Sequence, residues 1–153
     1  MPRRDLITIN GWSEYGLNVF DSVGVGGANN PGDVMVVQAM FRYLHDLSVQ
    51  KDYLQDYKHL WDGMDLEPTG ILDVRTKRTI IHYQQSNWYA VLSTDGVVHP
   101  AKYENRKITT GNGKRLMTIT HLHQELWMAE DNGKDYTKEI AKKFPNVAFW
   151  IRS

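Results

Sequence analysis

A glycine that follows one polar residue and precedes two apolar residues occurs twice in the chain. The first copy is TGILDVRT, which begins at Thr69, and the second is DGVVHPAK, which begins at Asp95. A glycine in such a context can take a positive φ that a side chain would penalise, so each copy predicts a tight turn. The short internal repeat predicts two related units, in each of which a turn leads into a helix.

The first copy carries the stronger helix signal. Ile71 and Leu72 are apolar and are expected to face the core, and Asp73 can cap a helix by accepting a hydrogen bond from a free backbone N–H. Such a cap stabilises a helix by about 1 kcal/mol. Apolar residues then recur at helical spacing, which predicts a helix over residues 74–88.

The rest of the chain predicts a mixture of helices, strands and loops. Further helices are expected at 34–47, with Asp33 as N-cap, near 51–60, at 115–130, and at 136–143, with Asp135 as N-cap. A turn is expected at Asp62-Gly63. The segments DLITINGW, YGLNVF and NVAFWI read as strands, and the last is a candidate partner for DLITI. SVGVGGANNPGD is expected to be a loop pinned by contacts, and ENRKITTGNGKR a polar loop.

Length and composition limit the kinds of site and partner that the chain can have. The 153 residues suggest one domain, 1–153, and the absence of cysteine excludes disulfides, thiolate metal sites and a cysteine nucleophile. Eighteen basic and 18 acidic residues give zero formal charge, which disfavours nucleic acid as a partner. No apolar run is long enough for membrane insertion. The N-terminus lacks the apolar core of a signal peptide, so localisation stays open.

Catalytic and metal signatures are weak. No G-x-S-x-G motif marks a nucleophile. His121 and His123 are the best metal-like pair, but on a helix they point to nearly opposite faces, whereas on a strand they would share one. The acidic residues Asp62, Asp65 and Glu67 lack the spacing of a calcium loop. Paired carboxylates far apart in sequence stay open. We expect no enzyme activity, no cofactor and no metal.

Three stretches in order resemble the peptidoglycan-binding-like domain family. They are NNPGDVMVVQAMFRYL, TGILDVRTKRTIIHYQQ and DGVVHP, within residues 28–100. The matching positions are Asp33, Val34, Val37, Gln38, Gly70, Leu72, Thr76, Ile80, Tyr83, Gln84, Asp95, Gly96, Val98 and Pro100. The chain departs from the family at Thr69, which replaces an Asp, at Asp73 and His99, which replace glycines, and at Lys102, where a second Thr is common.

The resemblance implies a small three-helix bundle. With the short strands read from the N- and C-terminal segments, which are unusual for the family, the expected fold is mainly α (α+β), with a family-like core at 28–100 elaborated by 1–27 and 101–153. It implies a non-catalytic module that binds bacterial cell-wall peptidoglycan and acts at the wall or in the periplasm if delivered there. Thr76 and Gln84 are expected to satisfy backbone groups of the first turn, and Gln38 to do the same from the first helix. An alternative is a protein–protein structural or adaptor module of a phage or secretion assembly.

Ligand contacts are expected near the helix at 74–88. Arg75, in its first turn, is a two-pronged donor for carboxylates. Thr76, Trp88 and Tyr103 complete the candidate set, with the tyrosine as an aromatic wall for a sugar. Two of the five tryptophans are expected to be accessible, with Trp61 and Trp88 favoured. These residues predict a groove between the turn at 69–76 and the loop after Pro100.

Overall fold

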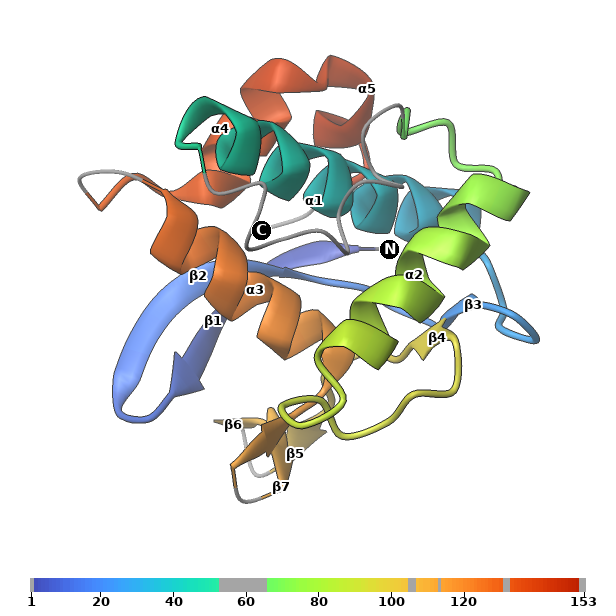
Figure 1. The fold of residues 1–153 in the computed structure, drawn as a ribbon. Coiled ribbons are helices and arrows are strands. Elements are labelled where there is room, and N and C mark those ends of the chain that lie inside the picture. The colour runs from blue at the N-terminus through green and yellow to red at the C-terminus, as the bar shows by residue number, and fades with distance from the viewer. Residues whose placement is uncertain (1, 53–65, 105–106, 113, 131–132, 152–153) are drawn as a thin grey trace.

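The computed structural model of the chain describes residues 2–52, 66–104, 107–112, 114–130 and 133–151. Within these ranges the chain forms five helices and four two-stranded antiparallel sheets (Figure 1). The helices are α1 (Pro31–Gln50), α2 (Val74–Ser86), α3 (Thr118–Ala129), α4 (Tyr136–Lys143) and α5 (Pro145–Ala148). The paired strands are β1 (Arg3–Ile9) with β2 (Trp12–Asn18), β3 (Val23–Gly24) with β4 (Val97–Val98), β5 (Tyr103–Glu104) with β6 (Lys107–Ile108), and β7 (Gly111–Asn112) with β8 (Arg115–Leu116).

This architecture is a mixed α+β fold, and the predicted three-helix bundle is wrong. Helices α4 and α5 both contact α1, and the β1–β2 hairpin packs against α3 and α4. The buried core draws on every one of these elements, from Leu17 in β2 to Val147 in α5. The residues outside 28–100 are therefore part of the core and do not merely decorate a bundle.

The N-terminal strand pairs with its neighbour in sequence. Asn10 and Gly11, both at positive φ, form the two-residue turn between β1 and β2, and Ile9 faces Trp12 across the ladder. An Asn-Gly pair favours this turn because its twist matches that of the flanking strands. The expected pairing of DLITI with NVAFWI is therefore wrong, and YGLNVF contributes its first four residues to β2.

The C-terminal segment NVAFWI is helical at its start. Pro145 occupies the first turn of α5, where its missing N–H leaves no hydrogen bond unmade. Trp150 then packs over the first turn of α1: a Cβ added at Gly32 would lie 2.7 Å from the indole ring. The C-terminal segment thus covers the start of α1 without adding a strand.

Helix α1 starts earlier than predicted, and Asp33 does not cap it. Pro31 opens the helix after Asn30, which makes no side-chain capping bond. Asp33 lies inside the first turn, and its two carboxylate oxygens accept the backbone N–H groups of Phe20 and Asp21 at 2.8 and 3.0 Å. This buried carboxylate connects the end of the hairpin to α1, at a helix end that favours negative charge.

The caps of α2 and α4 are confirmed. The Asp73 carboxylate accepts the N–H of Thr76 at 2.8 Å, and the Asp135 carboxylate accepts the N–H of Thr137 at 3.0 Å. Helix α4 spans the predicted residues, whereas α2 and α3 are slightly shorter than predicted. The predicted turn at Asp62-Gly63, and nearly all of the predicted helix near 51–60, lie outside the described residues.

The glycine-rich loop before α1 is pinned, as expected. The Asn29 side chain accepts the N–H of Gly24 at 2.8 Å and donates to the carbonyls of Gly24 and Gly27. The loop also pairs with the second glycine turn through β3 and β4. The predicted polar loop at 104–115 instead contributes to two short strand pairs, β5–β6 and β7–β8, at one end of the molecule (Figure 1).

Both predicted glycine turns are present, and a buried glutamine holds each one. Gly70 and Gly96 have φ of 81° and 77°. The Gln38 side-chain oxygen accepts the N–H of Gly70 at 2.9 Å, and the Gln84 side-chain oxygen accepts the N–H of Gly96 at 2.7 Å. The prediction for Gln38 is confirmed, whereas Gln84 serves the second turn and not the first.

The amide nitrogens of the two glutamines repeat the same pattern. Gln38 Nε2 donates to the carbonyl of Ile71 at 2.9 Å and to the hydroxyl of Thr76 at 3.0 Å. Gln84 Nε2 donates to the carbonyl of Val97 and to the hydroxyl of Thr118, both at 3.0 Å. Each glutamine therefore joins one helix to a turn and to the first turn of the next helix.

The residue before each glycine completes the unit. The Thr69 hydroxyl accepts the N–H of Ile71 at 3.2 Å, and the Asp95 carboxylate accepts the N–H of Val97 at 3.0 Å. We call each set of glutamine, glycine turn and threonine a Gln–Gly–Thr unit: Gln38, 69–71 and Thr76 form the first, and Gln84, 95–97 and Thr118 the second. The two units connect α1 to α2 and α2 to α3.

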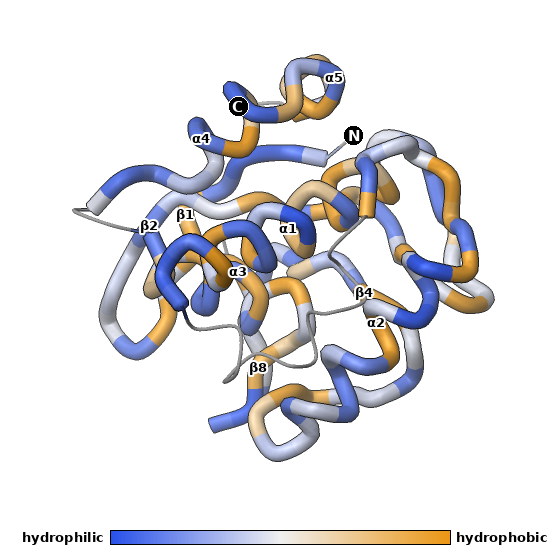
Figure 2. Tube along the Cα trace, turned by 45° about the horizontal axis from the view of Figure 1, so that its top comes forward, coloured by the Kyte–Doolittle hydropathy of each residue, from blue (hydrophilic) through white to orange (hydrophobic). Residues whose placement is uncertain are grey.

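Helices α2 and α4 bury one face and expose the other, whereas α1 and α3 are largely enclosed: none of residues 32–48 is exposed, and Met128 is the one exposed residue of α3. Figure 2 shows both hydrophobic and hydrophilic residues along α1 and α3. Among the described residues, no helix combines the length and apolar character needed to cross a membrane.

We predict that Gln84→Leu lowers the free energy of unfolding by about 2–3 kcal/mol, because it leaves the buried N–H of Gly96 without its acceptor. Gln85→Leu is the matched control: Gln85 is adjacent on α2 but exposed, and its replacement is expected to change stability by less than about 0.5 kcal/mol. Urea denaturation of both variants measures the difference. Equal losses in the two variants would contradict the role of the second unit.

Candidate functional site

The structure disperses the four predicted ligand residues. Thr76 is fully buried; its hydroxyl accepts from Gln38 and donates to the Asp73 carboxylate at 2.6 Å. Arg75 is exposed in the first turn of α2, and Trp88 lies just beyond the other end of that helix. Thirteen residues of helix correspond to roughly 20 Å, so Arg75 and Trp88 do not contact one small ligand together.

Tyr103 lies at the boundary of two surface hollows. Its ring is 48% exposed. One hollow, of about 450 Å³, is lined by Leu6, Thr8, Tyr103, Lys107 and Ile108. The other, of about 410 Å³, is lined by Lys102, Tyr103, Glu104, Thr109 and Met117. We call these hollows together the Tyr103 groove.

The Tyr103 ring is contacted from one side by the N-terminal strand. The Arg3 guanidinium lies 4.6 Å from the ring centroid, a cation–π distance, and the Asp5 carboxylate influences the pKa of the phenol. Asp5 is buried and also accepts from Arg3 Nε at 3.0 Å and from Asn18 Nδ2 at 3.2 Å. The N-terminal strand therefore covers part of one side of the Tyr103 ring.

Burial, and after it the nearby Asp5 carboxylate, raises the pKa of the Tyr103 phenol above its ordinary value. The ring is therefore a neutral phenol at physiological pH. What it offers a ligand is an apolar surface, which suits the C–H face of a sugar.

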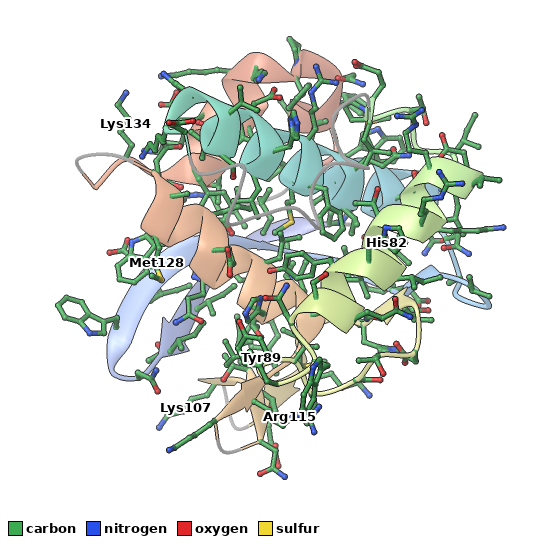
Figure 3. The ribbon with its side chains drawn as sticks, viewed as in Figure 1. His82, Tyr89, Lys107, Arg115, Met128 and Lys134 are labelled. Carbon is green, nitrogen blue, oxygen red and sulfur yellow. The ribbon has the colours of Figure 1, made fainter. Side chains whose placement is uncertain are left out.

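The charged residues of the Tyr103 groove are mainly basic. Lys102 and Lys107 are exposed on either side of the tyrosine, with Glu104 as the one carboxylate among the lining residues. Figure 3 shows Lys107 at the end of the molecule that the short hairpins form. The groove thus combines an aromatic surface with ammonium groups able to pair with carboxylates.

The histidine pair lies on a helix, as predicted, and its members face different partners. His121 Nδ1 lies 2.5 Å from the Tyr83 hydroxyl of α2, and His123 Nδ1 lies 2.8 Å from the Tyr136 hydroxyl of α4. One metal ion therefore cannot be coordinated by both imidazole rings. Across the described residues, no group of three or more His, Asp or Glu side chains is arranged to hold a metal ion.

Both histidines are neutral core residues. Burial lowers the pKa of His121 to about 4, and burial lowers the pKa of His123 to about 4 against the opposing effect of the Asp135 carboxylate. Glu125 Oε1 lies 3.8 Å from His121 Nε2. The two Tyr–His pairs therefore connect α3 to α2 and to α4 as neutral hydrogen bonds.

The tryptophan expectation is met in part. Trp88 is 65% exposed, and Trp61 lies outside the described residues. Trp12 was missed, although it is 67% exposed. The Asn-Gly pair before it is the signal that would have found it, because a two-residue turn places Trp12 at the tip of a hairpin.

Comparison of the chain with protein-family models, with curated proteins and with solved structures finds no match.

We predict that the free energy of unfolding decreases as the pH falls from about 6.5 to about 4. In this window the unfolded chain binds protons at His121 and His123 that the folded protein does not, so acid favours unfolding. The loss approaches roughly 3 kcal/mol per histidine. Asp46, Asp95 and Asp135, whose pKa values are lowered from 3.8, contribute at lower pH.

Urea denaturation between pH 7.5 and pH 4 measures this dependence. His123→Gln is expected to remove about half of it, and His82→Asn, a change at an exposed histidine of α2, is the control that retains it. A stability that is flat across the window would contradict the two buried, neutral histidines.

Proposed function

We propose that the protein is a non-catalytic binding module for bacterial cell-wall peptidoglycan, with the ligand in the Tyr103 groove. The observation that carries the proposal is the Tyr103 ring, which lies at the boundary of two hollows with the Arg3 guanidinium 4.6 Å from its centroid. Glycan rings stack on such a surface, and the carboxylates of peptide stems pair with Lys102 and Lys107.

The Gln–Gly–Thr units support the resemblance to peptidoglycan-binding-like domains. At two positions where the sequence departs from the family pattern, another side chain supplies the equivalent hydrogen-bonding group. The Thr69 hydroxyl accepts the N–H of Ile71 just as the Asp95 carboxylate accepts that of Val97. In the family, a second threonine is common at the position of Lys102. Here Thr118 supplies the equivalent hydroxyl, because residues 102–117 come between the second turn and α3.

The composition of the groove supports binding without catalysis. Glycoside hydrolysis by the common mechanisms uses two carboxyl groups on either side of the scissile bond. Glu104 is the single carboxylate among the residues that line the two hollows. The groove therefore has the groups for recognition and lacks a carboxylate pair.

A second candidate function is the protein–protein module of a phage or secretion assembly. An apolar hollow of about 280 Å³ lies at the start of α1, lined by residues that include Pro2, Phe20, Pro31 and Trp150. Phe20 is largely exposed, and so is Phe149, whose ring contacts that of Trp150. Exposed apolar surface of this kind favours a protein partner over a glycan.

We predict that the wild-type protein sediments with purified sacculi and that Tyr103→Ala weakens this binding about tenfold, or about 1.4 kcal/mol. Tyr103→Phe keeps the ring and is expected to retain most of the affinity. Tyr89→Ala is the matched control, because Tyr89 is 67% exposed but lines neither hollow. Circular dichroism and melting temperature verify that each variant is folded.

Unchanged sedimentation of a folded Tyr103→Ala variant would remove the groove from the proposal. Wild-type protein that stays in the supernatant at every sacculus concentration would contradict wall binding and favour the protein-partner function.

A further inference from the structure

A further hollow lies between the tip of the β1–β2 hairpin and α3. Its volume is about 170 Å³. Besides Ile9, it is lined by Asn10, Trp12, Glu14, His123, Gln124 and Trp127. We call it the tryptophan pocket. Drug-sized ligands occupy about 300–1,000 Å³, so this pocket suits a ligand of one ring.

The hairpin side chains that line the tryptophan pocket and those that line the Tyr103 groove are on opposite faces of the hairpin. Side chains of directly paired residues share a face, and the faces alternate along each strand. Trp12 pairs with Ile9, and Glu14 pairs with Ile7, whose buried side chain marks the face toward the core. Leu6 and Thr8, which line the Tyr103 groove, are on the other face.

The wall of the pocket is a pair of indole rings. Trp12 and Trp127 have ring centroids 6.2 Å apart and planes inclined at 40°. Trp12 is 67% exposed, whereas Trp127 is partly buried against the core. Trp127 thus supports Trp12, which presents a broad apolar surface to solvent at the end of a two-residue turn.

Apart from Ile9, the remaining lining residues are polar, with Glu14 as the one carboxylate among them. Asn10, Glu14 and Gln124 surround the indoles with amide donors and with amide and carboxylate acceptors. His123 is almost fully buried beneath them, and burial lowers its pKa to about 4, so its ring is neutral at pH 7. No lysine or arginine is among the residues that line the pocket.

We propose that the tryptophan pocket binds a single neutral sugar ring, stacked on Trp12 and hydrogen-bonded through its hydroxyls to Glu14 and Gln124. The aromatic surface matches the apolar face of a pyranose, and the amide and carboxylate match its hydroxyl edge. Glu14 repels acidic sugars, and no basic side chain in the pocket compensates. This inference goes beyond the proposed function, because it assigns a separate site with its own ligand.

The probe is N-acetylglucosamine, titrated into the full chain at pH 7 and followed by two-dimensional NMR. We expect saturable shifts of the Trp12 and Trp127 indole N–H signals, with glucuronate binding at least tenfold more weakly. Trp12→Ala is expected to weaken N-acetylglucosamine binding at least tenfold and Gln124→Ala several-fold. Trp88→Ala, at another largely exposed tryptophan, is the matched control and should leave binding unchanged.

The indole N–H signals of Trp12 and Trp127 separate the two sites, because neither residue lines the Tyr103 groove. These signals are expected to titrate whether or not the protein sediments with sacculi, so that failure in the sedimentation assay and failure here are independent. Absence of indole shifts at the highest sugar concentration, equal binding of glucuronate, or full binding by a folded Trp12→Ala variant would each overturn the proposal.

Discussion

Two buried glutamine side chains hold the helical part of this protein together. A primary amide can accept and donate at the same time, so Gln38 and Gln84 each satisfy an N–H and a carbonyl of a glycine turn and a hydroxyl of the following helix. Buried backbone groups without partners would destabilise the fold by about 1–3 kcal/mol each. The orientation of α2 relative to α1, and of α3 relative to α2, therefore depends on these two amides.

The positions of the Tyr103 groove and the tryptophan pocket depend on the segments that adjoin the Gln–Gly–Thr units. The second glycine turn pairs with the loop before α1 through β3 and β4, and the chain then leaves it toward Tyr103. The Asn18 side chain accepts the N–H of Ala101 and donates to its carbonyl, which fixes this exit against the hairpin. The hairpin in turn presents one face to the Tyr103 groove and the other to the tryptophan pocket.

Local signals predicted much of this fold, and pairing between distant segments was the harder part. The turns at Gly70 and Gly96 and the caps at Asp73 and Asp135 depend on a few adjacent residues, and all four are present. The strand assignment of NVAFWI was wrong because Pro145 is compatible with the first turn of a helix. Asp33 was read as a cap because its carboxylate partners, at Phe20 and Asp21, lie more than ten residues away.

The structure shows where the residues of the predicted site lie, and it does not bring them together. Tyr103 was expected to supply an aromatic wall, and it lines two hollows. The residues that line the larger hollow with Tyr103 belong to β1 and β6. That these strands lie next to each other becomes clear only once the pairing of the strands is known. Thr76 matched a sequence pattern because it bonds to Gln38, not because it is accessible. Thr118 could not be found by spacing, because two short strand pairs lie between it and the second turn.

The exchange rates of the Gly70 and Gly96 amide protons with deuterated solvent test this account most directly. Both N–H groups are buried and donate to glutamine oxygens, so they are predicted to exchange only through global unfolding, with protection equal to that of core helix amides. The amide of Gly26, in an exposed part of the glycine-rich loop, provides the comparison within the same spectrum. Exchange of Gly70 and Gly96 as fast as that of Gly26 would contradict the central role of the two glutamines.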